Sequence, residues 1–405
     1  MNLLFSAGYG IDMKQIQWLV VWSIGILILS PANLQAAQSL LSGKISAELT
    51  KSVTSVNNLE NIEIDKQKPV LIAAPENFNP GLQVPPPLPK PTPKPSPPAN
   101  PQERIQPFAV LENIQTDFRN DTDNFGQHNL FIEPTFQWRS PNGNKYFIKT
   151  GFDFFEQRGF ESVTNIPWQI GWQGKIGDVT LQTAAGVDVF DRLPTAINFN
   201  AKVSAPIVQP QVSSSGKLIS AVILSVNLDQ APYKFNAQTL ENQITAWRFG
   251  PDLYWQIDRY TSLFSSLRLG NYNDGNSEIQ SFSRLERKFG QFSLAANLFN
   301  WSYDRNLEST NGYFSPPDFL VYNAEVAWQG DIVNFLRCRL SANLGQQRLK
   351  GEWDNATTYQ TRCTAKISPE IEADLGYNFS NVRNQDTGGS AYGGDSLTGQ
   401  LRVKF

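Results

Sequence analysis

The chain has few of the residues that perform catalysis or bind metal ions. Its 405 residues include only two cysteines, Cys338 and Cys363, and a single histidine, His128. A zinc site needs several Cys or His ligands, and a Cys–His nucleophile pair needs both residue types together. No nucleophile is identifiable beside His128, which leaves a lipase or protease with little support. We therefore expect a protein that is not an enzyme and that uses no cofactor and no metal.

Long apolar runs and an excess of one charge are also missing. Beyond the N-terminus no stretch approaches the roughly 20 apolar residues that a membrane helix requires. The net charge of −3 gives no reason to expect a nucleic-acid partner. The mean hydropathy of −0.34 does not exclude a membrane protein, because transmembrane β-strands alternate apolar and polar residues. Aromatic residues are frequent, with 10 Trp and 26 Phe, as expected for a sheet with aromatic positions at a membrane interface.

The first 37 residues have the organisation of a secretory signal peptide. Lys14 precedes the apolar run Trp18–Ser30, and a proline break and the small residues Ala36–Ala37 follow. A positive residue, a short apolar core and an alanine-ended exit are the parts of such a signal. We predict cleavage after one of these two alanines. Met13 heads a complete signal by itself and is an alternative start.

Residues 38–107 form a second segment without sustained periodicity. Proline dominates Gly81–Pro101, and repeated proline fixes φ and removes hydrogen-bond donors. Such a stretch is expected to be an extended polyproline-II spacer. We predict a disordered, proline-rich periplasmic tether. Its lysines offer an alternative role, which is contact with cell-wall polymers or with a partner.

From Phe108 onward, short segments alternate apolar and polar residues. In Leu397–Phe405 the odd-numbered residues are apolar or glycine, and the even-numbered ones are Thr, Gln, Arg and Lys. Period-2 alternation predicts a strand with one apolar and one polar side. The pattern recurs over residues 320–328, 336–344, 362–367 and 371–379. In a soluble sandwich the polar side would meet bulk water, whereas in a membrane barrel it faces the lumen.

The connections between these segments favour the membrane barrel. Short turns at Lys288–Gln291, Asp258–Arg259 and Ser368–Pro369 alternate with longer polar loops. These loops lie near Asn271–Ser277, Asp304–Asp318, Gly345–Thr357 and Ser380–Ser396. Counting gives about 16 strands, an even number that puts both ends in the periplasm. We predict an all-β, transmembrane antiparallel barrel over residues 108–405, surrounded by the lipid of a Gram-negative-type outer membrane.

Charged residues on the polar side are expected to line the lumen of this barrel. Sixteen strands leave room for a water-filled channel, whereas eight leave almost none. Two roles for the charges stay open, namely hydrogen bonding to a hydrated solute and mutual pairing that stabilises the barrel. The projected inner residues are Lys149, Asp153, Arg248, Asp252, Arg268, Arg284, Glu286, Glu325, Arg337, Arg339, Arg362, Lys366, Glu372, Asp374, Arg402 and Lys404.

The C-terminal residue and the two cysteines fit the same register. A strand that ends the chain on Phe405 resembles the signal by which outer-membrane barrels are recognised, which implies the barrel insertion machinery as a partner.

Cys338 and Cys363 fall on the apolar side of neighbouring strands. An oxidising compartment permits a disulfide between them, but directly paired strand cysteines are often strained. A structural disulfide and two free thiols both remain open.

Two loop motifs resemble the C-terminal barrel of cellulose synthase operon protein C, an exopolysaccharide-secretion porin family. The family's Tyr-x-Asp-Gly-Asn-like turn is matched within NYNDGNS, and its Gly-Tyr-Phe-Ser-Pro-like loop within NGYFSPPDFL. The matching residues are Tyr272, Asp274, Gly275 and Asn276, followed by Gly312, Tyr313, Phe314, Ser315 and Pro316. The second motif is expected either to shape a pore-facing loop or to form a rigid external turn.

The resemblance implies a 16-stranded outer-membrane porin that passes an exopolysaccharide such as cellulose. The family places a long array of tetratricopeptide repeats before its barrel, and no 34-residue helical repeat is visible in this sequence. The identity of the cargo is therefore open, and so is the existence of a periplasmic secretion component that binds the protein. The alternatives are a general diffusion porin for small polar solutes and a non-transporting barrel that anchors the envelope.

Overall fold

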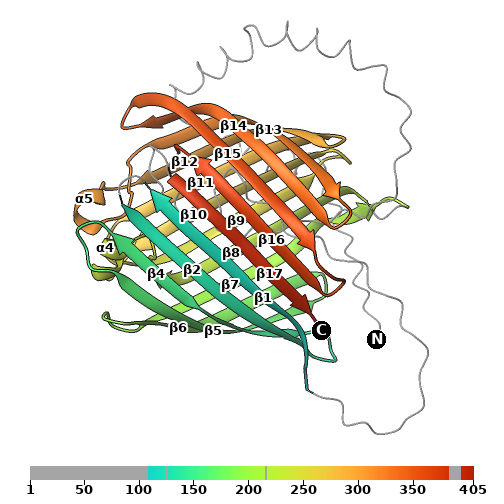
Figure 1. Ribbon diagram of the computed structural model, residues 1–405, viewed down its shortest axis with the longest axis horizontal. Coiled ribbons are helices and arrows are strands. Elements are labelled where there is room, and N and C mark those ends of the chain that lie inside the picture. Colours follow the sequence, from blue (N-terminus) through green and yellow to red (C-terminus); the bar gives the residue numbers. More distant parts are fainter. Residues whose placement is uncertain (1–107, 124–125, 215–216, 383–393) are drawn as a thin grey trace, which may run out of the picture. The chain divides into compact units, whose positions relative to one another are not determined.

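A computed structural model of the protein describes residues 108–405, apart from 124–125, 215–216 and 383–393. The predicted signal peptide and proline-rich tether lie outside the described residues. The described part is one antiparallel sheet whose strands run from one end of a barrel to the other (Figure 1). Among its residues no helix is long and apolar enough to cross a membrane.

The sheet contains 17 strands, and two short helices lie between strands. The elements are β1 (Val110–Asp123), β2 (Gln127–Arg139), β3 (Lys145–Thr150), β4 (Phe152–Gln157), β5 (Val163–Ile176), β6 (Val179–Phe190), β7 (Ala196–Val212), β8 (Leu218–Pro232), α4 (Ala237–Glu241), β9 (Thr245–Gln256), β10 (Thr261–Tyr272), β11 (Ser277–Phe289), β12 (Phe292–Tyr303), α5 (Glu308–Asn311), β13 (Phe319–Val333), β14 (Leu336–Leu349), β15 (Glu352–Lys366), β16 (Ile371–Ser380) and β17 (Gly394–Lys404).

Strands β3 and β4 together make a single crossing of the barrel. Both pair with β2 on one side and with β5 on the other, and only Gly151 separates them. A Cβ atom at Gly151 would lie 2.5 Å from the carbonyl oxygen of Ile132, so only glycine allows the close backbone approach at this break. The described chain therefore crosses the barrel 16 times, and the predicted fold class and strand number are confirmed.

The first and last strands pair with each other and close the barrel. β1 and β17 are in antiparallel register from Asn113↔Lys404 to Asp123↔Gly394. The backbone N–H of Phe405 then donates to the carbonyl of Glu112 at 3.1 Å. We call the end of the barrel that holds Val110 and Phe405 the termini end, and the opposite end, which holds α4 and α5, the loop end (Figure 1).

The predicted alternation between the two sides of each strand is present in the barrel. In β17, Ser396, Thr398 and Gln400 are buried inside, whereas Leu401 is exposed on the outer side. The outer surface carries many further exposed apolar side chains, including Leu375. Since apolar residues of a water-soluble barrel would point inward, the reversed arrangement indicates lipid outside and polar contents inside.

Two of the predicted loops are shorter in the structure than the sequence indicated. The segment Gly345–Thr357 is wrong as a loop, because β14 and β15 stay paired up to Leu349↔Glu352 and leave only the turn Lys350–Gly351. Likewise β10 and β11 reach Tyr272 and Ser277, so that only four residues remain between them. In both places polar residues were taken as a sign of a loop, although paired strands continue with polar side chains. Part of the predicted loop Ser380–Ser396 lies outside the described residues.

The outward cysteines lie opposite each other in the register. Cys338 in β14 faces Cys363 in β15, and a disulfide joins them over a sequence separation of 25 residues. A cross-link of that span restricts the unfolded chain by about 3 kcal/mol in the chain-entropy description.

We expect the double replacement Cys338→Ser and Cys363→Ser to lower the free energy of unfolding by up to about 3 kcal/mol. The reason is that the hairpin β14–β15 loses its covalent constraint while its strand pairing stays. Urea unfolding of the refolded barrel in detergent, followed by tryptophan fluorescence, measures the change. The wild-type protein under reducing conditions is the control and should match the variant. Equal stability of wild type and variant would show that the bond contributes nothing.

Candidate functional site

The interior of the barrel is the candidate functional site, and its charged side chains are arranged in pairs. Arg268 in β10 contacts both carboxylate oxygens of Asp252 in β9, at 2.7 and 3.1 Å. Arg402 in β17 lies 3.3 Å from Glu372 in β16. These contacts join adjacent strands. The inner charges thus neutralise one another along the wall.

A group of four charges occupies the inner face of β11, β13 and β14. Arg284 binds Glu325 through both guanidinium ends, at 2.7 and 2.8 Å, and Glu286 at 2.7 Å. Arg339 donates to the same Glu325 at 2.7 Å. The Glu325 side chain is only 1% exposed, so its charge depends on these two guanidinium groups. We call Arg284, Glu286, Glu325 and Arg339 the charge quartet.

Other residues projected onto the inner face occupy different depths. Arg362 and Asp374 are buried as neighbours on β15 and β16, at 3.7 Å. Arg337 lies near the β13–β14 turn and contacts Asp331 at 3.8 Å. Lys366 and Lys404 have the inner-face register, but they end their strands and are exposed at the termini end. These two lysines therefore belong to the rim of the barrel, and not to the enclosed lumen.

Neutral hydrogen-bonding groups fill the wall between the charge pairs. Asn297 donates to Asn323 at 2.8 Å and to Asn343 at 3.3 Å, which forms an amide row across β12, β13 and β14. The buried inner residues of this kind include Asn198, Ser341, Thr358, Gln360, Asn378, Ser396, Thr398 and Gln400. The inner wall between the charge pairs therefore consists of amides and hydroxyls.

The two loop motifs, which lie some forty positions apart in the sequence, meet at the loop end. The Asn276 side chain donates to the hydroxyl of Tyr313 at 2.9 Å, and that hydroxyl donates to Asp274 at 2.9 Å. Gly275 and Gly312 have φ of +78° and +84°, a backbone region that favours glycine. The contact explains why both motifs contain these residue types. Since Tyr313 is buried against the inner wall, the second motif is not a simple external turn.

An aromatic cluster surrounds this contact on the inner side. The rings of Tyr272 and Tyr313 are stacked with centroids 5.2 Å apart, and Trp301 and Tyr303 pack around them. Glu278 accepts from the hydroxyl of Tyr272 and from the indole of Trp301, both at 2.7 Å. The burial of these rings holds the two motifs against the inner wall at the loop end.

The loop Tyr233–Ile244, between β8 and β9, folds inward over the lumen. The carbonyl of Phe235 accepts from the side chains of Gln127 at 3.0 Å and Asn129 at 2.9 Å, both on β2. Strands β3 to β7 lie between β2 and β8 in the sheet. On the other side, Asn236 donates to the carbonyl of Gly312 at 2.8 Å. The loop therefore links distant parts of the inner wall, and Figure 1 shows α4 and α5 at the same end of the barrel.

Lys234 attaches this loop to the wall. Its ammonium group lies 2.8 Å from Asp153 in β4 and 2.7 Å from Asp188 in β6. Burial acts to lower the pKa of Lys234, but the carboxylates of Asp153, Asp188 and Glu133 outweigh it and raise the pKa above its usual value. The lysine therefore stays charged across the physiological pH range.

His128 does not contribute to this site. Its side chain lies on the outer side of β2, where Nε2 is 2.6 Å from Asn120 and Nδ1 is 3.6 Å from Glu156. Within the described ranges, no cluster of three or more His, Cys, Asp or Glu side chains could hold a metal ion.

Several residues of the site were missing from the residues predicted to face the lumen. The notable cases are Lys234, Asp188, Glu278 and Glu133. Lys234 belongs to a loop without periodicity. The alternation of the strands does not indicate which inner carboxylate this lysine contacts. The alternation in β6 and β11 would have placed Asp188 and Glu278 on the inner face.

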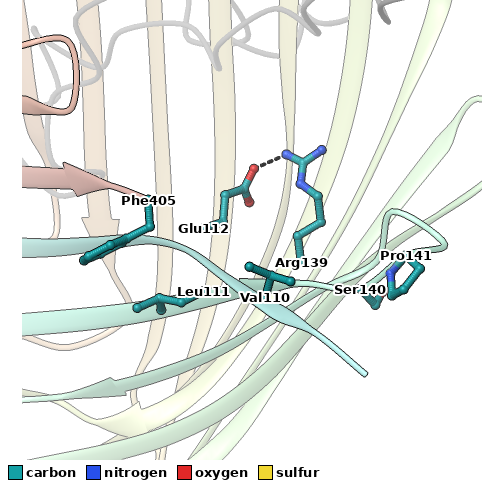
Figure 2. A pocket seen from close by; sticks show the side chains of 7 residues that line it. All are labelled: Val110, Leu111, Glu112, Arg139, Ser140, Pro141 and Phe405. Atoms are coloured by element: carbon teal, nitrogen blue, oxygen red, sulfur yellow. Dashed lines mark hydrogen bonds and ion pairs between the residues drawn. The ribbon is translucent and has the colours of Figure 1, made fainter. Parts of the chain in front are cut away.

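An open pocket lies at the termini end, outside the lumen wall just described. Figure 2 shows that Phe405 and Val110 flank it and that Glu112 is paired with Arg139. Lys145 lies 3.3 Å from the same carboxylate. These ion pairs tie the first strand to β2 and β3 beside the C-terminal residue.

Comparison with known proteins identifies the fold. No protein-family model and no curated protein matches the sequence. Among solved structures, a bacterial polysaccharide outer membrane secretin is similar with a TM-score of 0.59 and 12% identity, covering 73% of this chain and 98% of that one. CdiB from Acinetobacter baumannii has a TM-score of 0.47 and 10% identity (72% and 60% covered), and OprD from Pseudomonas aeruginosa 0.39 and 8% (73% and 93%). The chain thus has the fold of outer-membrane β-barrels.

Proposed function

We propose that the protein is an outer-membrane porin that conducts a neutral, cellulose-like exopolysaccharide out of the periplasm. The observation that carries this proposal is the inner wall, in which charges are tied together and amides and hydroxyls remain. A hydrated neutral glucan presents hydroxyl groups, which exchange hydrogen bonds with amides and hydroxyls at little cost. A charged polymer would instead need an excess of opposite charge along its path.

Two further observations support the polysaccharide as cargo. The solved structure with a TM-score of 0.59 is named a polysaccharide outer membrane secretin. The two family-like motifs also contact each other through Asn276 and Tyr313, so their joint presence has a structural role. In this proposal the N-terminal segment lies in the periplasm, where a secretion component is its partner, and the barrel insertion machinery recognises Phe405. The protein binds no cofactor and catalyses no reaction.

A general diffusion porin is the second candidate. It is favoured by the presence of inner charges of both signs on the wall, such as Arg268 and Asp252. Such a porin would discriminate by size and not by sugar structure.

Single-channel conductance in planar bilayers tests the two candidates. We expect the refolded barrel to conduct potassium chloride and soluble cello-oligosaccharides to block the current in proportion to their concentration. Acidic oligosaccharides of equal length are the control and should block at least about tenfold more weakly, because inner arginines such as Arg268, Arg284 and Arg402 already face carboxylates. A current that all sugars leave unchanged would favour the general porin. Lys234→Gln removes the ion pairs that attach the inward loop to the wall, so this variant shows whether the loop alone blocks the current. Absence of conductance in both the wild type and this variant would exclude transport.

A further inference from the structure

The inward loop Tyr233–Ile244 is held at its two faces by different kinds of contact. Its helix α4 packs Ala237 and Leu240 against Phe131, Phe155 and Val163 on the inner wall. The neutral hydrogen bonds of Phe235 to β2 add a directional contact. Tyr233, at the start of the loop, also packs in the aromatic cluster, with its ring centroid 5.3 Å from that of Tyr272 and 5.5 Å from that of Tyr313. This end of the loop is therefore the anchored one, and the end with α4 is the one that Lys234 holds to the wall.

The carboxylates that bind Lys234 are also held by neighbouring amide side chains. The Asn165 side chain donates to both Asp153 and Asp188 at 2.9 Å, and Asn198 donates to Asp188 at 2.8 Å. The two carboxylates are 0% and 1% exposed, whereas the Lys234 side chain is 21% exposed. Two buried negative charges held together this way need a cation between them. The loop lysine supplies it.

Two buried oxygens in this receptor have no hydrogen-bond donor among the described residues. Among the described residues, Oδ1 of Asp153 and Oδ1 of Asn165 accept no hydrogen bond. An acceptor that is buried without a donor is costly. The receptor is therefore incompletely satisfied by Lys234, which lowers the free-energy difference between the attached and the detached loop.

We propose that Tyr233–Ile244 is a gate of the channel and that Lys234, seated between Asp153 and Asp188, is its lock. This inference rests on the proposed function, because a gate has meaning only in a conducting barrel. With the lock engaged, the loop crosses the loop end and restricts passage. When Lys234 leaves its receptor, the loop detaches from β4 and β6, and the lumen opens towards the loop end.

A charge-neutral variant of the lock tests the proposal. We expect Lys234→Gln to raise the open fraction of single channels by about tenfold or more, since the amide cannot neutralise two carboxylates. Arg402→Gln is the matched control. It removes an equal charge from the inner face, where Arg402 lies 3.3 Å from Glu372 near the termini end, away from the loop. The control should leave the open fraction unchanged.

A cross-link between the loop and the wall should lower the open fraction of the channel. Gln238 in the loop and Gln157 in β4 are in contact, with the Gln238 N–H donating to Gln157 at 3.0 Å. Cysteines at these two positions, joined by a short cleavable cross-linker, should hold the gate shut and reduce the current to a small fraction. Cleavage should restore it. The wild-type barrel given the same reagents controls for the native disulfide.

The outcomes separate the gate from the porin. If the wild type, the Lys234→Gln variant and the cross-linked variant all conduct equally, the gate is refuted, whereas the proposed porin function is not. An Arg402→Gln variant that opens as much as Lys234→Gln would also refute the lock, because net charge alone would then explain the effect. If none of the proteins conducts, the proposed function fails with the gate.

Discussion

Replacing Glu325 with alanine is expected to destabilise the barrel by about 3–5 kcal/mol, because it removes the shared acceptor of the charge quartet. Arg284 and Arg339 both donate to this carboxylate at 2.7 Å. Without it, two guanidinium groups at the inner wall are left with Glu286 as their remaining quartet carboxylate. Urea unfolding of the refolded barrel, followed by tryptophan fluorescence, would measure the loss.

A double-mutant cycle distinguishes lost charge from lost packing. Glu325→Gln keeps the side-chain volume and should still cost most of the stability. Adding Arg339→Gln removes one cation and restores the charge balance of the quartet, so the double variant should recover part of the loss. If Glu325→Gln is as stable as the wild type, the quartet is hydrated and its pairing does not hold the strands together.

The adjacent residue on the same strand points to the outer side of the barrel and tests its contact with lipid. Val326 is 53% exposed on the outer side of β13, near the middle of the strand. We expect Val326→Arg to cost about 2–4 kcal/mol in a lipid bilayer, since a charged side chain at the midplane of a barrel must be desolvated by lipid. Folding equilibrium measured in phosphatidylcholine vesicles gives the value.

Ile332→Arg is the matched control for this substitution. Ile332 lies on the same strand and is 55% exposed, but it sits at the termini end. Because the cost of an outward arginine falls to about 0–1 kcal/mol near the interface, this variant should fold almost normally. Equal costs at Val326 and Ile332 would contradict the placement of the membrane, and the absence of any cost would contradict lipid contact on this side.

The strands and their two sides could be predicted because alternation is a local property. Leu401 and Gln400 need only their neighbours in the sequence to be assigned to opposite sides of β17. The charges of β11 and β13 followed from the same rule. Pairing between particular charges could not be predicted in this way, because it depends on which strands are adjacent and on their register.

The inward loop is the part of the site that the sequence did not reveal. Residues 233–244 contain no motif, and a loop that enters the lumen has the same composition as one that leaves it. Polar strand ends were also misjudged, as at Gln347 and Asn355, since polarity is shared by loops and by strands that extend beyond lipid. The signal peptide and the proline-rich tether stay predictions.

The pairing of β1 with β17 makes the hydrogen-bond ladder circular, and this has a consequence for assembly. The buried contact between Ser396 and Asp121 joins residues 275 positions apart. No subset of strands forms a finished sheet, because every partial barrel presents two rows of unsatisfied backbone donors and acceptors. The pairing of β1 with β17 therefore satisfies the last two open edges, and a copy that lacks β17 should be an aggregation-prone ribbon and not a smaller channel.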